Sequence, residues 1–215
     1  MKYTKPPKTF DQQADLLLSR GMVADRDLLV ARLREVNYYR LSAYWYPFRS
    51  QSGDQLLPDT RFDIVWDRYV FDRQLRVLTM DAIERVEVSI RTRLVNAFVL
   101  QHGAFGHVDR SNLPNLSVDD HRRFMLKIRN EESRSKEPFV EHFHKKYTSE
   151  TDLPLWIASE LMDFGTMFTL YRGVEAPIKQ EVAKVFGISD RVLDSWLTSL
   201  NTIRNMCAHH ARLWN

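Results

Sequence analysis

The chain has 215 residues, of which 44% are hydrophobic and 27% are charged, and this balance is typical of a soluble globular protein that can bury at least one core. No apolar run approaches the ~18 residues that span a bilayer, the N-terminus lacks the apolar core of a signal peptide, and the single cysteine, Cys207, excludes an internal disulfide. The formal charge of +3 and the pI of 9.0 are compatible with a polyanionic partner, but no basic tail indicates one. We therefore expect a cytoplasmic protein without a membrane segment.

Only seven glycines and eight prolines interrupt the chain, and long stretches contain neither, so an all-α fold is expected. Two short helices should come first, after a basic lead-in. Thr9 and Gln12 have the spacing of a capping box, Gly21 offers a helix stop, and Asp25 can cap the second helix. These elements predict a small N-terminal helical extension.

An aromatic and basic segment follows over residues 37–49, with six aromatic side chains and two arginines. One interpretation is an RNA-binding platform, in which Tyr38 and Tyr39 stack on bases and Arg40 holds a phosphate. The other interpretation, which the composition favours, is that these aromatics form the core between the first helices and the main body.

A polar turn over residues 51–58, which includes Ser52, is the expected domain boundary. It separates the N-terminal extension, residues 1–55, from a main helical domain, residues 56–215. Glycine and proline are then absent until Gly103, so the main domain should begin with one long helix that forms the spine of the fold.

The long helix is expected to be amphipathic. Its predicted buried seam has helical spacing and consists of Leu75, Leu78, Ala82, Ile83, Val86, Ile90, Leu94 and Phe98. Another side carries charges, namely Arg76, Glu84, Glu87 and Arg91. These charges form either a solvated face with weak ion pairs or the border of a functional site, and the sequence leaves both interpretations open.

Five further helices are expected after a loop at residues 101–116. They cover residues 117–128, 138–147, 154–171, 177–186 and 189 onward. The third of them is strongly apolar and predicted to be buried, with an interruption or a close approach at Gly165. The last should bury Val192, Leu193, Trp196, Leu197, Leu200 and Ile203. His142 and His144 do not predict a metal site, because side chains two residues apart on a helix point away from each other.

The end of the chain, residues 204–215, combines two arginines, an amide and two adjacent histidines after an apolar helix. Each helical residue turns ~100°, so Asn205 and His209 should share a face that Arg212 extends. Arg204 and His209 would lie about 140° apart and converge only through the long arginine side chain or a distorted helix. The spacing alone therefore does not make one catalytic face.

Two interpretations of this terminal motif are open. Histidine suits proton transfer near neutral pH, and the planar donors of arginine fit a phosphate, so the motif suits metal-free cleavage of a phosphodiester. In RNA the nucleophile, the 2′-hydroxyl, is already present. The other interpretation is an exposed helix end, where cations meet the negative end of the helix dipole. The motif by itself favours the helix end, because so short a pattern is common.

Several blocks of sequence follow one another from residue 5 to the end of the chain. They are Lys5-Pro6-Pro7 with Thr9-Phe10 and Gln12-Gln13, Asn37 to Ser42 with Tyr44 to Pro47, Ile83-Glu84 with Glu87 to Arg91, Pro154-Leu155-Trp156, Phe164-Gly165, Leu170-Tyr171, Arg204-Asn205 with Cys207 to His209, and Arg212 to Asn215. With these blocks the chain resembles the Abi-like abortive-infection family (AbiD/AbiF type), bacterial phage-defence proteins of the HEPN superfamily of helical ribonucleases.

The resemblance implies an HEPN-like helical bundle and a ribonuclease motif in which four to six residues separate arginine and histidine. Arg204 and His209 match it, and His210 also fits the spacing. It implies a metal-independent and cofactor-free endoribonuclease of a phage-defence or toxin–antitoxin system that leaves 2′,3′-cyclic phosphate and 5′-hydroxyl ends. His209 would act as general acid or base, and Arg204 would bind the scissile phosphate. The supporting residues would be Asn205, His210 and Arg212, and the candidates for RNA binding are Tyr38, Tyr39, Arg40, Glu84, Glu87 and Arg91.

The resemblance also bears on partners. HEPN sites are typically built from two units and this chain has one motif, so a homodimer with a composite active site is expected, with RNA as substrate and an RNA or protein antitoxin as a further partner. The alternative is a non-catalytic module that binds RNA or a partner protein in such a system. Members of the family commonly continue beyond the motif, whereas this chain ends at Asn215.

Overall fold

The computed structural model describes residues 2, 4, 6–51 and 53–214. These residues form ten α-helices and four short 3₁₀ helices and contain no strand, so the all-α prediction is confirmed. Three residues used above lie outside the described residues: Lys5 in the first block, Ser52 in the polar turn and Asn215 in the last block.

The chain divides into two compact units. The first contains Met1–Leu78 together with His209–Asn215, and the second contains Thr79–Ala208. The expected domain boundary near residue 55 thus falls inside the first unit, because the helix that follows the polar turn packs against the N-terminal helices. The division into domains at residue 55 stays a prediction.

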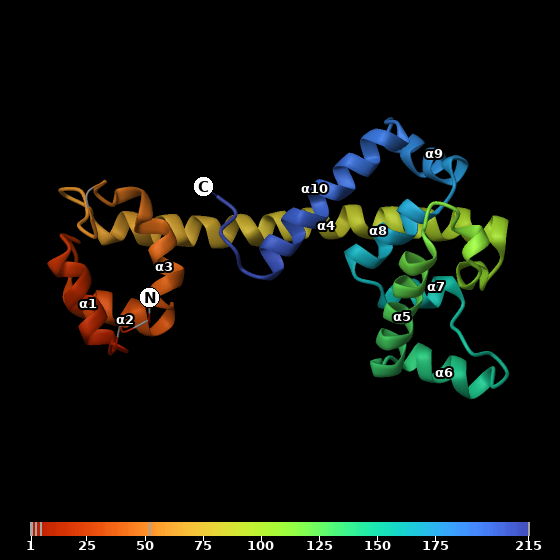
Figure 1. The fold of residues 1–215 in the computed structure, drawn as a ribbon, viewed down its shortest axis with the longest axis horizontal. Coiled ribbons are helices and arrows are strands. Elements are labelled where there is room, and N and C mark those ends of the chain that lie inside the picture. Colours follow the sequence, from red (N-terminus) through yellow and green to blue (C-terminus); the bar gives the residue numbers. More distant parts are fainter. Residues whose placement is uncertain (1, 3, 5, 52, 215) are drawn as a thin grey trace. The chain divides into compact units, whose positions relative to one another are not determined.

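The first unit is built on short capped helices (Figure 1, red to yellow). They are α1 (Phe10–Ser19), α2 (Arg26–Glu35), α3 (Tyr38–Trp45), the 3₁₀ helix η1 (Tyr46–Phe48) and the first part of α4 (Phe62–His102). The Thr9 hydroxyl accepts from Gln12 N, and Asp25 accepts from Leu28 N, so both predicted caps are confirmed. Gly21, with φ of +94°, follows α1 as expected.

The core of the first unit contains much of the aromatic segment. Tyr44 and Trp45 are buried beside Leu41 and the apolar faces of α1 and α2, whereas Tyr39 and Tyr46 remain exposed. The buried stripe of α4 in this unit has a spacing of three and four residues and consists of Phe62, Val65, the partly buried Tyr69, Asp72 and Arg76. Arg76 is only 5% exposed, so of the two interpretations of these charges the solvated face does not hold for this residue.

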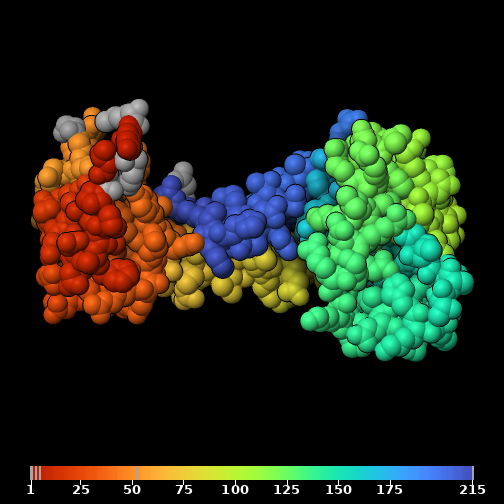
Figure 2. Space-filling model, turned by 60° about the horizontal axis from the view of Figure 1, so that its bottom comes forward, coloured from red at the N-terminus to blue at the C-terminus, as the bar shows by residue number. Residues whose placement is uncertain are grey.

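The second unit packs around the later part of α4. Its helices are η2 (Gly106–Val108), η3 (Arg110–Asn112), α5 (Val118–Arg134), α6 (Pro138–Lys146), α7 (Leu155–Ala158), η4 (Ser159–Leu161), α8 (Phe164–Gly173), α9 (Ala176–Lys184) and α10 (Asp190–Ala208). The core includes Ile83, Ile90, Leu94 and Phe98 of α4, as the predicted seam requires. The side chains of α5 run as a continuous surface across this unit (Figure 2, green).

Several apolar side chains that were expected in the core are exposed instead. Leu78 is 69% exposed, Trp156 is 50% exposed and Trp196 is 52% exposed. On α10 the buried stripe runs through Leu193 and Leu197, and Trp196 lies beside it rather than in it. The break in the apolar stretch after Pro154 falls at Met162, before Asp163 caps α8, and not at Gly165. Helical spacing identified these helices, but their neighbours decide which apolar side chains are covered.

The packing of α4 against η2 can be tested by a substitution at Gly106. A Cβ on Gly106 would lie 2.6 Å from His102 Cβ, an atom fixed by the backbone of α4. We expect Gly106→Ala to destabilise the fold by about 1–3 kcal/mol and to lower the midpoint of thermal unfolding by several degrees. Gly53→Ala is the matched control, because nothing lies within 4 Å of its Cβ position. Equal midpoints for the two variants would contradict this packing.

Candidate functional site

The terminal motif does not continue as a helix. The last helix, α10, ends at Ala208, and His210 has a φ of +55°, a left-handed conformation that ends a helix. The expectation that Asn205, His209 and Arg212 share one helical face is therefore wrong. His209 and His210 form an exposed turn, and residues 211–214 continue as a non-helical segment.

The predicted site residues belong to different compact units. Arg204 and Asn205 lie on α10 in the second unit, with Arg204 partly buried and Asn205 exposed, whereas His209, His210 and Arg212 belong to the first unit. In each unit, the predicted site residues lie among other charged side chains.

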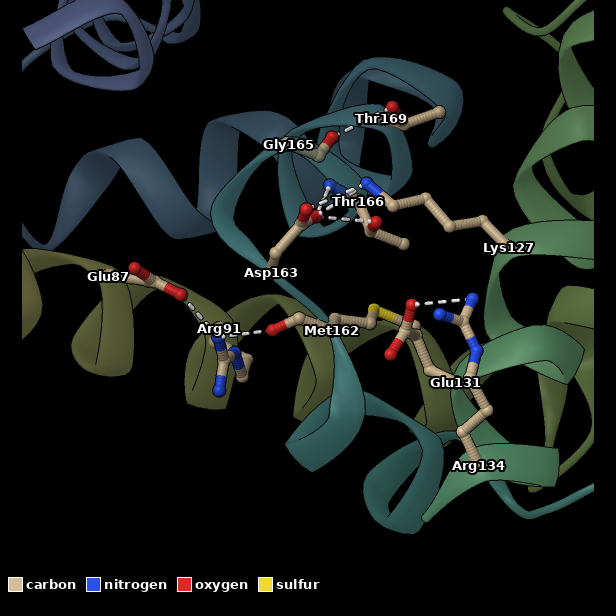
Figure 3. Close-up of polar contacts among 10 residues, drawn as sticks. All are labelled: Glu87, Arg91, Lys127, Glu131, Arg134, Met162, Asp163, Gly165, Thr166 and Thr169. Atoms are coloured by element: carbon tan, nitrogen blue, oxygen red, sulfur yellow. Dashed lines mark hydrogen bonds and ion pairs between the residues drawn. The ribbon is translucent and has the colours of Figure 1, made fainter. Parts of the chain in front are cut away.

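In the second unit, a partly buried ion pair lies near Arg204. Glu87 and Arg91, one turn apart on α4, have side chains only 14% and 13% exposed and are directly paired, and Arg91 Nη2 also donates to the Met162 carbonyl at 2.9 Å (Figure 3). Burial raises the pKa of Glu87, while the charges of Arg91 and Arg204 oppose this shift. Glu87 is thus partly buried between the charges of Arg91 and Arg204, whereas Glu84 is exposed.

Asp163 is the second acid near this group. Its carboxylate accepts from Thr166 N at 2.8 Å, which caps α8, and from Lys127 Nζ at 2.7 Å (Figure 3). Burial would raise the pKa of Asp163, but the bonds to Lys127 and Thr166 outweigh it and hold this pKa below its ordinary value. Arg91 also lines a cavity of about 370 Å³, together with Asn96 and the half-exposed Trp156.

In the first unit, the segment after the histidines is held by α3 and α4. Arg40 Nη1 donates to the His210 carbonyl at 2.6 Å, and Arg212 donates to the Ala43 carbonyl. Asp72 on α4 accepts from the backbone N–H groups of Leu213 and Trp214 at 2.9 and 2.7 Å. His209 and His210 are exposed, while Arg40 holds the His210 carbonyl.

The three candidates for RNA binding in the aromatic segment differ in exposure and in their contacts. Tyr38 is half-buried and accepts from Arg20 Nη1 at 3.0 Å, and Tyr39 is 75% exposed. Arg40 is engaged by the terminal segment, so its guanidinium is partly occupied. Of the two tyrosines, Tyr39 presents more surface to an RNA.

The sequence did not identify Asp72, Tyr44 or Asp163 as site residues. Asp72 and Arg76 are four residues apart and continue the apolar stripe of Phe62 and Val65. This spacing is the feature of the sequence that could have indicated their place in the stripe. The described residues contain no group of three or more histidine, cysteine, aspartate or glutamate side chains that could hold a metal ion. His144 instead pairs with Glu132 of α5 at 2.9 Å.

Comparison with known proteins gives the family. A model of the family described as Abi-like protein matches residues 31–215, which is most of the chain. The chain belongs to the Abi-like family. For an Abi-like protein this membership implies a part in abortive infection, a form of phage defence. No curated protein and no solved structure matched the Abi-like chain. None of its described helices is long and apolar enough to cross a membrane.

The cap of α8 leads to a test by substitution and pH. Asp163→Ala should destabilise the Abi-like protein by about 1 kcal/mol, because it removes the cap, whereas Asp163→Asn keeps a capping oxygen but loses the charge and one of the two oxygens that accept from Lys127. Because the folded pKa of Asp163 lies below the ordinary 3.8, its charge stabilises the fold above pH 3.8 and this contribution disappears as the pH falls through the folded pKa. Urea unfolding of all three proteins across this range measures both effects.

The two variants separate the contributions. The advantage of the wild type over Asp163→Asn should shrink below pH 3.8, while Asp163→Ala should stay less stable than Asp163→Asn at every pH. A constant wild-type advantage over Asp163→Asn across the range would contradict the role of the charge.

Proposed function

We propose that this protein is a metal-independent endoribonuclease of the HEPN type that acts in abortive infection or in a toxin–antitoxin system. The observation that carries the proposal is the end of the chain, where Arg204 near the end of α10 is followed within a few residues by two exposed histidines, the second held at its carbonyl by Arg40. Such a combination supplies a phosphate ligand and a proton-transfer group without a metal.

In the proposed reaction the 2′-hydroxyl oxygen of RNA attacks the adjacent phosphorus, and the bond to the 5′-oxygen breaks. His209 takes or returns the proton, and Arg204 holds the phosphate as its charge grows. The products are a 2′,3′-cyclic phosphate and a 5′-hydroxyl. Glu87 pairs with Arg91 and interacts electrostatically with Arg204, so this pair borders the proposed phosphate site.

The proposed active form is a homodimer. The chain carries one arginine–histidine motif, and two chains related by a two-fold axis can bring an arginine and a histidine together from opposite protomers. RNA would then cross the two-fold axis. The Trp156 cavity beside Arg91 and the exposed ring of Tyr39 are candidate contacts for its bases.

A second function, RNA or partner binding without cleavage, is favoured by one observation. Tyr39 and Tyr46 lie seven residues apart, are 75% and 65% exposed, and have Arg49 stacked over the Tyr46 ring at 5.6 Å. An exposed aromatic pair with a nearby guanidinium suits single-stranded RNA whether or not the chain cuts it. Stable binding of RNA that the wild-type protein leaves intact would favour this function.

Cleavage can be tested with total RNA in EDTA. We expect the wild type to cut RNA with chelator present and to leave cyclic phosphate ends, and we expect Arg204→Ala and His209→Ala to lose about 10²-fold or more in rate. End-group analysis and gel assays measure both results. His142→Ala and Arg122→Ala are matched controls, because both residues are exposed on helices of the second unit. Loss of activity in EDTA, or full activity in both site variants, would contradict the mechanism.

The composite site can be tested by mixing the two inactive variants. If each site takes Arg204 from one protomer and His209 from the other, half of the random dimers contain one intact site, so about a quarter of the wild-type activity should return. Size-exclusion chromatography should show a dimer. A mixture as inactive as its components, with exchange of subunits demonstrated by labelled chains, would place both residues in one protomer.

A further inference from the structure

The buried stripe of α4 in the first unit ends in charge rather than in apolar side chains. Phe62 and Val65 are followed at the same helical spacing by Asp72 and Arg76, whose side chains are 0% and 6% exposed. The two side chains form a direct ion pair. A buried ion pair is costly to desolvate and is often less stabilising than apolar side chains of similar size, so its presence calls for a specific role.

The contacts of Asp72 identify that role. Asp72 Oδ1 accepts from Leu213 N at 2.9 Å and from Trp214 N at 2.7 Å, while Oδ2 accepts from the Tyr44 hydroxyl at 2.6 Å and from Arg76. A carboxylate has about four acceptor positions, and here all four are filled. Two of the four donors are main-chain groups of the terminal segment, so Asp72 is a receptor for that segment.

The partners of Asp72 make the receptor rigid. Arg76 Nη1 donates to the Ala211 carbonyl at 3.3 Å, so the ion pair binds both a carbonyl and two N–H groups of the same short segment. Tyr44 is 3% exposed, and burial together with its bond to Asp72 raises the pKa of its hydroxyl to about 12, so the hydroxyl keeps its proton as a donor at neutral pH.

The bound segment is continuous with the histidines. Arg40 holds the His210 carbonyl, and the Trp214 ring packs edge-on against Phe71 with centroids 5.7 Å apart. Contacts at residues 210, 211, 213 and 214 therefore fix the backbone directly after His209, while the imidazole rings stay exposed. Loss of the Asp72 contacts would free the end of this segment and let the histidine turn adopt other conformations.

We propose that Asp72, with Tyr44 and Arg76, is a positioning group that holds the terminal segment in place and thereby sets the orientation of His209 and His210 for catalysis. The catalytic role of this group rests on the proposed ribonuclease function. The binding of the terminal segment by Asp72 does not depend on that function. These residues touch no substrate; they act through the backbone of residues 211–214.

The test uses two variants that differ in severity. Asp72→Asn keeps the side-chain shape but replaces one acceptor oxygen by an NH₂ group, which faces either the two backbone N–H groups or Tyr44 and Arg76. Tyr44→Phe removes a single hydroxyl and keeps the buried ring, so it provides a folded variant if Asp72→Asn is unstable. Asp63→Asn is the matched control, because it is the same change on the same helix in an exposed ion pair with Arg61.

Two readouts are measured on the full chain. Hydrogen exchange followed by mass spectrometry should show faster exchange of the Leu213 and Trp214 amides in Asp72→Asn, a smaller increase in Tyr44→Phe and no change in Asp63→Asn. RNA cleavage should show kcat reduced about tenfold or more in Asp72→Asn, with KM within about twofold of the wild type, because the positioned histidine acts in the chemical step.

The outcomes are distinguishable. Unchanged exchange of the Leu213 and Trp214 amides in both variants would overturn the receptor role of Asp72. Faster exchange with unchanged kcat would overturn the positioning role, and a rise in KM at constant kcat would assign the segment to RNA binding instead. If the wild type cleaves no RNA, the proposed ribonuclease function fails and the positioning role fails with it, while the exchange measurement still decides whether Asp72 holds the segment.

Discussion

Both hydrophobic cores of this protein depend on one helix. The first part of α4 buries Phe62 and Val65 among α1, α2 and α3, and its later part buries Ile90 and Leu94 among the helices from α5 to α10. A proline or a glycine within α4 would weaken a wall of either core, which is consistent with their absence between Pro58 and Gly103. The continuity of this helix is therefore the constraint on which the remaining packing depends.

The helices could be predicted from sequence because their ends depend on local chemistry. Thr9, Asp25 and Ser117 each bond a backbone N–H within three residues, and such contacts are encoded by spacing alone. The burial of individual apolar residues was harder to predict from the sequence. Trp156 and Trp196 have the spacing of core residues but are half-exposed, because the neighbouring helices cover other parts of the same faces. Burial depends on tertiary contacts that no local pattern contains.

The candidate site shows the same division. The residues of the terminal motif were identified through blocks that resemble a family, and that family is confirmed. The prediction that they share one helical face was wrong, because α10 ends at Ala208. The contacts that hold the segment after α10 come from α3 and α4. Asp72 and Arg76 could be seen in the sequence as a pair four residues apart, but not as buried, since such pairs usually lie on a solvated face.

The way in which Asp72 binds the terminal segment has a consequence for how the sequence can vary. The carboxylate contacts backbone N–H groups, which every residue except proline provides, so the contact at position 213 does not depend on the side chain there. Many residue types at position 213 can therefore keep the hydrogen bond to Asp72. Positions 44, 72 and 76 have no such freedom, because their side chains bond to one another. Substitutions at these three positions should therefore be rarer than at position 213.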